Sequence, residues 1–253
     1  MTRRMGSIVI FAALFVGTAV AQNSVPYTRD EVATLKKKLV NALDAVGQPP
    51  AGYAKEKENF SLPTDASKNN ESGLFYPAYG SGDRMFGAGK SAEKSQKELQ
   101  NDYEKKVAEA QAKGDYQAIA KLAQEMQQKA GEMQLKSIEG KKVPIEIHIN
   151  INSNPGEAID PDGVLFERTG VIALKEKSDG DEEKSRIRIF FDPVNLKDTK
   201  QLSKVDMKMP EKGVSSKTAV YNITVEFDGP TTEIEAWAKK IESGKVLAQI
   251  DGK

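Results

Sequence analysis

Residues 87–91 read Gly-Ala-Gly-Lys-Ser, directly before a predicted helix, and could bind phosphate. A phosphate-binding loop needs Gly-x-x-x-x-Gly-Lys-Ser/Thr after a buried strand, so that backbone amides surround the phosphates and the lysine contacts the last one. The position of the first glycine is Arg84, and no apolar run precedes it. The segment therefore predicts a helix lead-in with Ser91 as the cap, and not a nucleotide site.

His148 is the only histidine of the chain and the one candidate for a general base or a zinc ligand. Either role needs partner groups that orient the imidazole or share the metal. Glu146 and Asn150 lie at strand spacing on either side, as the polar face of any strand would place them. A hydrolase that uses His148 is thus our third hypothesis, and we expect no metal and no cofactor.

Two acidic turns, at 160–162 and 179–183, could offer oxygen ligands to calcium. Neither follows the Asp-x-Asp-x-Asp-Gly pattern with its distal glutamate. Aspartate and glycine are also the ordinary residues of turns, which is the interpretation we favour.

The strongest structural pattern is a helical hairpin over residues 91–136. Gly114 can end the first helix and Asp115 can cap the second. The second helix carries apolar residues at the spacing of a coiled-coil heptad. This predicted seam comprises Tyr116, Ile119, Ala123, Met126, Ala130 and Met133.

A further helix is predicted over residues 28–46. Thr28 and Glu31 have the spacing of a capping box, and Gly47 follows the last apolar residue. Its apolar stripe is expected to pack on the hairpin seam, because two helices alone form a marginal structure.

Residues 49–90 contain many proline, glycine, serine and asparagine residues, which predicts an irregular segment. The segment also holds six aromatic residues, more than a disordered linker would have. We favour an ordered arm that buries these rings, and the alternative is an exposed loop that binds a partner. The candidate partner-binding residues are Phe75, Tyr76, Tyr79 and Phe86.

From residue 143 onward the apolar period changes to two, which is typical of strands with one buried face. Isoleucine occupies every second position from Ile145 to Ile151, and similar alternation follows at 187–191 and 221–227. Short turns between these segments favour antiparallel pairing. A helix over 232–243 should press Trp237 onto the sheet, and a last strand is expected at 246–250.

The N-terminus has the features of an export signal: Arg3 and Arg4, an apolar run over 8–20, and Ala-Val-Ala before Gln22. Its removal would leave a net charge of −2, which argues against a nucleic-acid partner. The absence of cysteine excludes disulfides and thiolate sites. No transmembrane segment is expected after the signal.

These patterns predict an α+β protein: a signal over 1–21, a helical region with the hairpin over 22–140, and an antiparallel β-sheet covered by a C-terminal helix over 141–253. We expect an exported, non-catalytic protein of the periplasm or cell exterior that binds another envelope or extracellular protein. The alternative is a carrier that holds an apolar ligand between the sheet and the helices.

Overall fold

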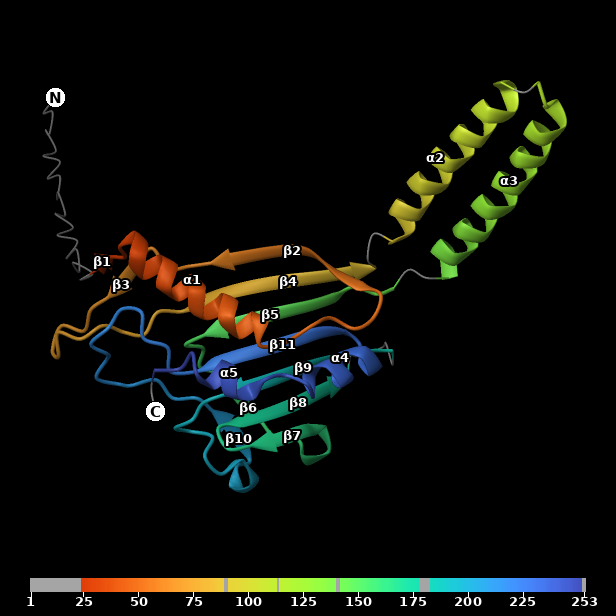
Figure 1. Ribbon diagram of the computed structural model, residues 1–253. Helices are drawn as coiled ribbons and strands as arrows, with labels where there is room; N and C mark the ends of the chain where they lie inside the picture. Colours follow the sequence, from red (N-terminus) through yellow and green to blue (C-terminus); the bar gives the residue numbers. More distant parts are fainter. Residues whose placement is uncertain (1–23, 89–90, 113, 140–141, 178–182, 252–253) are drawn as a thin grey trace, which may run out of the picture.

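The computed structural model describes residues 24–88, 91–112, 114–139, 142–177 and 183–251. The predicted export signal, and Gly89 and Lys90 of the glycine-rich segment, lie outside these residues. Most described strands form one antiparallel sheet of seven strands in the order β2-β4-β5-β11-β9-β8-β7 (Figure 1). Their bounds are β2 Tyr53–Ser61, β4 Gly80–Ala88, β5 Ile145–Ile151, β7 Val164–Arg168, β8 Val171–Lys177, β9 Lys184–Phe191 and β11 Ile223–Pro230.

One face of this sheet carries the main hydrophobic core. Ile147 of β5 lies opposite Phe227 of β11, which in turn lies opposite Ile187 of β9. All three are fully buried, because alternation along each strand sends every second side chain to the same face. The predicted alternation of β5, β9 and β11 is thereby confirmed.

Three helices cover this face: α1 Arg29–Asp44, α4 Thr231–Ala238 and α5 Ser243–Leu247 (Figure 1). Trp237 of α4 is buried, and its ring meets those of Phe86 and Phe227 edge to face, with centroids 4.9 and 5.7 Å apart. Its indole nitrogen donates to the carbonyl of Val46 at 3.0 Å, which links α4 to the end of α1. The predicted role of Trp237 between helix and sheet is confirmed.

A smaller core lies on the opposite face, over β8 and β9. Ile172, Leu174 and Phe190 point to this side, where the paired strands β6 Gly156–Ala158 and β10 Lys204–Asp206 and the loops around them cover part of the sheet. Val205 and Met207 close this second core. The rest of the face, over β4, β5 and β11, carries polar side chains.

The predicted fold class is wrong in its division of the chain. The protein is mostly a seven-stranded antiparallel sheet, and the part before the hairpin contributes only one helix, α1, together with strands β2 and β4. The segment 49–90 is therefore not irregular throughout, because two of its stretches are strands of the sheet, while residues 68–79 between them are irregular. The segment also contains β3 Asp65–Ser67, which pairs with β1 Ser24–Pro26.

These strands escaped prediction because neither shows apolar alternation. β2 is an edge strand with charged residues from Lys55 to Glu58, which protect an edge against unwanted pairing. Gly82 of β4 lies opposite Ile149 of β5, on the face where the other strands carry large residues. A Cβ at position 82 would lie 2.8 Å from the ring of Phe60. The glycine thus makes room for an aromatic ring of the neighbouring strand.

Helix α1 begins as predicted but packs elsewhere. The side chain of Thr28 accepts from the amide of Glu31 at 3.2 Å, and the Glu31 carboxylate accepts from the amide of Thr28 at 2.8 Å. Leu35 and Leu39 are fully buried against the sheet, with β4, β5 and α5 as neighbours. The prediction that α1 packs on the hairpin seam is wrong, because the sheet face offers a larger apolar surface.

The C-terminal prediction also needs correction. The expected helix over 232–243 is divided into α4 and α5, and the expected last strand is part of α5 and the turn after it. Val246 and Ile250 are buried while Ala248 is exposed. The buried residues are therefore four positions apart, as in a helix, and not two apart, as in a strand.

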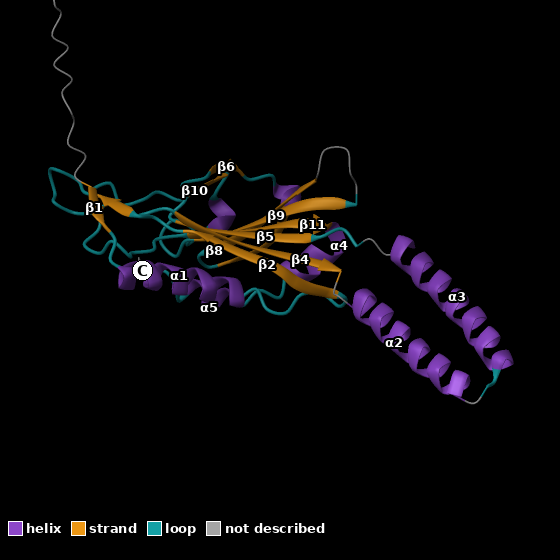
Figure 2. Cartoon of the chain, turned by 90° about the horizontal axis from the view of Figure 1, so that it is seen from above, coloured by secondary structure: helices purple, strands orange, loops and turns teal. Residues whose placement is uncertain are grey.

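Helices α2 Ser91–Ala112 and α3 Tyr116–Glu139 form an antiparallel pair inserted between β4 and β5. Because β4 and β5 are neighbours in the sheet, the pair takes the place of a β-hairpin turn. It extends away from the end of the sheet, as both views show (Figures 1 and 2).

Candidate functional site

The α2–α3 hairpin is a candidate binding element because it lies apart from the hydrophobic cores. No described residue of α2 or α3 belongs to the main core or to the smaller one. In Figure 2 the hairpin continues outward from the sheet, and the covering helices α1 and α5 lie along the sheet instead. The stability of the body therefore does not depend on packing by the hairpin.

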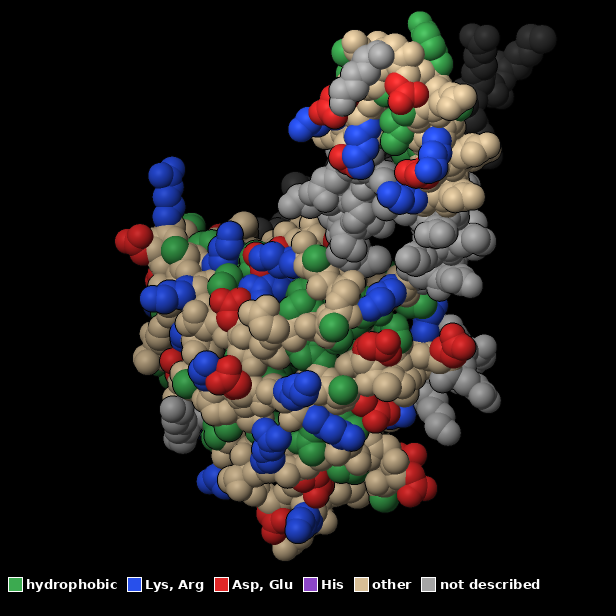
Figure 3. All heavy atoms as spheres, turned by 45° about the vertical axis from the view of Figure 1, so that its right-hand side comes forward, with side chains coloured by type: hydrophobic (Ala, Val, Ile, Leu, Met, Phe, Trp, Pro, Cys, Tyr) green, Lys and Arg blue, Asp and Glu red, His purple; other side chains and the backbone are tan. Residues whose placement is uncertain are grey.

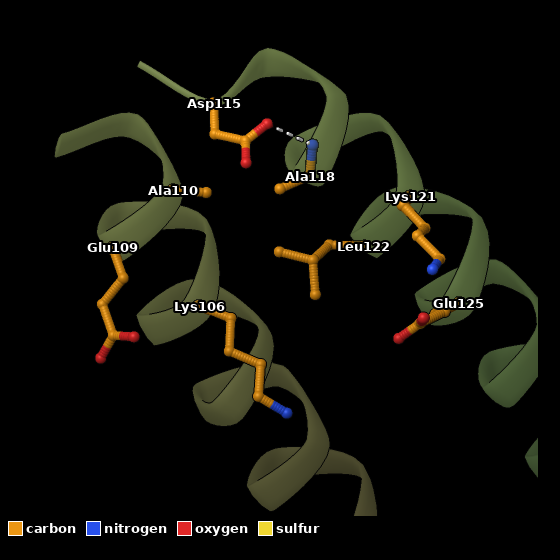
Figure 4. A pocket seen from close by; sticks show the side chains of 8 residues that line it. All are labelled: Lys106, Glu109, Ala110, Asp115, Ala118, Lys121, Leu122 and Glu125. Carbon is orange, nitrogen blue, oxygen red and sulfur yellow. Dashed lines mark hydrogen bonds between the residues drawn. The ribbon is translucent and has the colours of Figure 1, made fainter. Parts of the chain in front are cut away.

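The turn of the hairpin has the geometry that its residues predict. Gly114 has a φ of 68°, in the left-handed region that glycine adopts without steric cost. The amide of Asp115 donates to the carbonyl of Ala110 at 3.0 Å, as in a Schellman motif. The Asp115 carboxylate accepts from the amide of Ala118 at 2.9 Å, so the predicted N-cap is confirmed (Figure 4).

The seam between the helices differs in part from the predicted one. Ile119 and Met126 are half-buried as expected, but Tyr116 is 80% exposed and Ala123 is exposed too. Leu122 takes the central place and points across the gap toward α2 (Figure 4). The helical period of 3.6 rotates the stripe away from a strict heptad, and the short α2–α3 pair has no long supercoil to correct it.

The described part of the seam is only partly covered. In α2 the corresponding residues are Tyr103 and Val107, both half-buried, and Ala110, which is 7% exposed. Small residues meet near the turn, where Ala110 faces Ala118 (Figure 4). Around this contact the helices leave a hollow of about 340 Å³. Two helices alone thus shield the apolar stripe incompletely.

One broad face of the hairpin carries this hollow, and it is charged. Its rim is formed by Lys106, Glu109, Asp115, Lys121 and Glu125, over a floor of Ala110, Ala118 and Leu122 (Figure 4). Figure 3 also shows charges of both signs beside hydrophobic side chains on the hairpin. We call the side that carries the hollow the hollow face.

Among the charges of the hollow face, Lys106 forms an ion pair within its own helix. Lys106 Nζ lies 2.7 Å from Asp102 Oδ2, one turn earlier in α2. The hydrogen bond from Lys106 lowers the pKa of the Asp102 carboxyl, and the charge of Lys129 in α3 acts in the same direction. The ion pair lies within α2 and is exposed, so it adds little to the contact between the two helices.

The opposite broad face is almost free of charge. Two stripes form it, each with spacings of four, three and four residues: Gln100, Glu104, Val107 and Gln111 in α2, and Tyr116, Ala120, Ala123 and Gln127 in α3. At 100° per residue both stripes lie beside the seam, on the side away from the hollow. All these side chains are exposed except Val107, which is half-buried. We call this side the uncharged face.

The candidate partner-binding aromatic residues do not form one surface. Phe86 is buried in the main core against Trp237. Phe75 is half-buried, and its backbone exchanges two hydrogen bonds with Val214. Tyr76 and Tyr79 are exposed, and the hydroxyl of Tyr79 lies 2.5 Å from Oδ1 of Asn150. Tyr76 and Tyr79 thus remain exposed from the predicted contact, and Tyr79 lies beside the polar face of the sheet.

His148 lies on the polar face of the sheet in a row of charged residues. Asp83, His148, Glu226 and Arg188 face one another across β4, β5, β11 and β9. Nδ1 of His148 lies 2.7 Å from Oδ1 of Asp83, and Nε2 lies 3.5 Å from Glu146 Oε2. Asp83 was not foreseen as a partner, because it lies in a strand that the sequence pattern did not reveal.

The electrostatics of this row favour a protonated histidine. Burial lowers the pKa of His148, but the hydrogen bond and the charge of Asp83, with help from Glu226 and Asp228, raise it above 6.5. Burial and the nearby Asp228 also raise the pKa of Glu226, against the opposing charge of Arg186. Because carboxylates face both ring nitrogens, no nucleophile among the described residues is in position to be activated by His148.

The other chemical candidates find no support among the described residues. No cluster of histidine, aspartate or glutamate in them could hold a metal ion. At the acidic turn 160–162 the Asp160 side chain accepts from the amide of Asp162 at 3.0 Å, as a turn residue does. A strand does precede the glycine-rich segment, against our expectation, but Gly87 is a paired residue of that strand.

Comparison with protein-family models, with curated proteins and with solved structures finds no match. Among the helices of the described ranges, none combines the length and the apolar character needed to cross a bilayer.

Proposed function

We propose that this chain is an exported protein of the periplasm or cell exterior that binds another protein through the α2–α3 hairpin. One observation carries the proposal: the hairpin extends from the body with an apolar seam that the chain itself covers only partly. Such a seam is uncommon on a surface that has no partner.

The energetics of helix pairs favour a binding role. Short helices owe their stability to tertiary packing, and here the packing within the hairpin leaves Ile119, Leu122 and Met126 half-buried. A partner that covers these side chains would remove apolar area from water at about 25 cal/mol per Å². Binding would therefore order and stabilise the element that makes the contact.

The carrier hypothesis is supported less well. The space between the sheet and the helices holds interlocking rings of Phe86, Phe227 and Trp237, so an apolar ligand would have to displace core side chains. The hollow of about 290 Å³ between α1 and α5 is lined by Asn41, Asp44, Lys245 and Gln249 with two alanines, so it offers an apolar ligand no large hydrophobic side chain.

Removal of the hairpin tests the proposal. Phe86 of β4 lies opposite Ile145 of β5, so Ala88 and Val143 are also opposite each other. A two-residue Asn-Gly turn can therefore join Ala88 to Val143 in place of residues 89–142. We expect the shortened chain to fold, because the main core contains no residue of α2 or α3. Chemical cross-linking in the envelope of the source organism should link a protein to the full chain but not to the shortened one.

A matched variant separates the hairpin from the exposed tyrosines. The double variant Tyr76→Ala, Tyr79→Ala should retain the cross-linked protein, since these residues lie on the body. Retention by the shortened chain together with loss in the double variant would reject the hairpin as the binding element.

A further inference from the structure

We propose that the hollow face of the hairpin binds an amphipathic α-helix of a partner protein, which lies along the hollow as a third helix. This inference rests on the proposed binding role of the hairpin, and it adds the face that makes the contact and the class of segment that fills it. Three features of the hollow favour a helix: its apolar floor, the lack of free backbone groups beside it, and the charges of its rim.

The floor of the hollow is apolar and leaves room for side chains of a partner. Ala110 and Ala118 meet near the turn, and Leu122 borders the hollow with a half-buried side chain (Figure 4). Because alanine is small, a partner element can approach closely there and place larger apolar side chains in the hollow of about 340 Å³. The partner segment must therefore present an apolar stripe.

The backbone beside the hollow favours a helix over an extended segment. Helices α2 and α3 use their amide and carbonyl groups within each helix, so their sides offer no row of free groups. A strand laid on the apolar floor would lose water from its own backbone groups without gaining partners, which is costly. A helix satisfies its backbone internally, and a helix in an apolar groove is bound through its side chains alone.

The rim of the hollow carries charges that lack an ion-pair partner in the described part of the chain. Lys106 pairs with Asp102 in the same helix. In contrast, Glu109, Lys121 and Glu125 form no ion pair with any described residue, and all three are exposed. A partner can therefore reach these charges. In helix bundles the charged residues beside the apolar seam decide which helices pair.

The spacing of the rim charges fits a helical partner. Lys121 and Glu125 are four residues apart in α3, about 6 Å along the axis. A partner helix with a glutamate and a lysine four residues apart repeats this distance, so it can meet both charges at once. Glu109 lies across the hollow on α2, where a basic residue on the other flank of the partner would meet it (Figure 4).

The described hollow is short, so the contact should be weak and reversible. Asp115 and Glu125 limit it along α3, which corresponds to about 15 Å or roughly three helical turns. A docked helix of this length buries less than the ~800 Å² per partner of a standard interface. We therefore expect dissociation constants of roughly micromolar size or above.

The test uses the purified full chain and a synthetic helical peptide of about 20 residues as the probe. The peptide has leucine at the a and d positions of its heptads, with glutamate and lysine four residues apart on its flanks. It carries a fluorescent label and is kept at nanomolar concentration, while the chain is titrated. We expect fluorescence anisotropy to show saturable binding. A peptide with the same flanks but serine in place of leucine should not bind.

A variant of the floor locates the contact on the chain. Leu122→Glu places a carboxylate in the apolar floor and should weaken binding of the peptide about tenfold or more. The matched control is Gln124→Glu, which adds the same charge on the outer side of α3 and should leave binding unchanged. Helical circular dichroism of both variants shows that the hairpin is intact at the temperature of the titration.

A charge exchange on the rim tests the contact without altering the floor. Lys121→Glu should weaken binding several-fold, because an acidic side chain then faces the glutamate of the peptide. A second peptide, with lysine in place of that glutamate, should regain binding to this variant, and damage to the fold cannot produce such a rescue. Lys105→Glu, on the outer side of α2, is the control and should bind both peptides as the wild type does.

Two results would overturn the inference. One is the absence of peptide binding at the highest soluble concentration of the chain. The other is binding that Leu122→Glu and Lys121→Glu both leave unchanged, since the peptide would then occupy another surface. Either result leaves the proposed function standing if cross-linking of an envelope protein still depends on the hairpin. A cross-linked protein that the shortened chain retains would reject the proposed function itself.

Discussion

Ile147 in β5 and Leu122 in α3 are both apolar residues in the regular pattern of their element, yet their surroundings differ. Ile147 is 1% exposed and lies under the covering helices, whereas Leu122 is half-buried and borders an open hollow. The body closes its core with helices from both ends of the chain. The hairpin has only its own two helices, so its apolar seam stays available to a partner.

The difference shows why pattern strength is a poor guide to burial. The hairpin has the clearest helical pattern of the sequence but packs least, while β4 has almost no pattern and lies in the interior of the sheet. Burial depends on what the rest of the chain brings against an element, which the pattern of that element does not encode.

The largest effect is expected from Phe86→Ala in the body. The substitution leaves a cavity beside Trp237 and should lower the free energy of unfolding by about 3–5 kcal/mol. Urea unfolding, followed by the fluorescence of the single tryptophan, measures it. Tyr76→Ala is the control and should cost under ~0.5 kcal/mol because that side chain is exposed. Equal losses would mean that Phe86 is not part of the core.

Ile147→Ala should lower the free energy of unfolding by about 2–5 kcal/mol. His148→Ala, one residue further on the polar face, should cost less than about 1 kcal/mol, because it removes a half-exposed ion pair. The same urea experiment compares the two. A greater loss for the histidine variant would invert the assignment of the two sheet faces.

Leu122→Ala should act on the hairpin alone. The side chain is half-buried, so we expect a loss of roughly 1 kcal/mol, seen as reduced helical circular dichroism at elevated temperature. The near-ultraviolet signal of Trp237 should not change, and Gln124→Ala should leave both signals as in the wild type. A change at Trp237 would show that hairpin and body fold as one unit.

The smallest effect concerns pH. The pKa of His148 is raised in the folded protein, mainly by Asp83 acting against burial. Its ion pair therefore stabilises the fold fully below pH 6.5, and this contribution is lost as the pH rises through the folded pKa. The expected loss is a few tenths of a kcal/mol, since the pair is partly exposed. The free energy of unfolding is measured as a function of pH for the protein and for His148→Asn, and the difference between the two curves gives the contribution of the ion pair. Identical curves would contradict the stabilising role of this pair.

Local signals in the sequence were sufficient for several elements of the fold and of the candidate site. The capping box at Thr28, the turn at Gly114 and the alternation of β5 each depend on neighbouring residues, so they could be predicted. The helices of the hairpin were foreseen for the same reason. The exposure of Tyr76 and Tyr79 goes against the favoured expectation that the segment buries its rings. The two faces of the hairpin were not foreseen, because the stripe at Ala123 was assigned to the seam by a strict heptad count.

The predictions that failed concern contacts between distant segments. Asp83 meets His148, and Phe86 meets Trp237, only because β4 pairs with β5 and lies under α4. A strand at a sheet edge, or one with glycine opposite an aromatic ring, carries charged and small residues that resemble a loop in sequence. Hydrophobic periodicity predicts a strand that has one buried apolar face. It does not predict a strand whose residues are charged because they protect a sheet edge, or small because a neighbouring ring needs room.

The sequence by itself determined the helices α1, α2 and α3 and the strands β5, β9 and β11, because caps, turns and apolar periods act over a few residues. Only the tertiary structure decided that α1 covers the sheet instead of the hairpin, that β2 and β4 belong to the sheet, and that Ala123 faces solvent. The physical reason is competition for apolar surface: the broad face of the sheet attracts α1, α4 and α5, and the hairpin is left with two unequal faces, one charged and one uncharged.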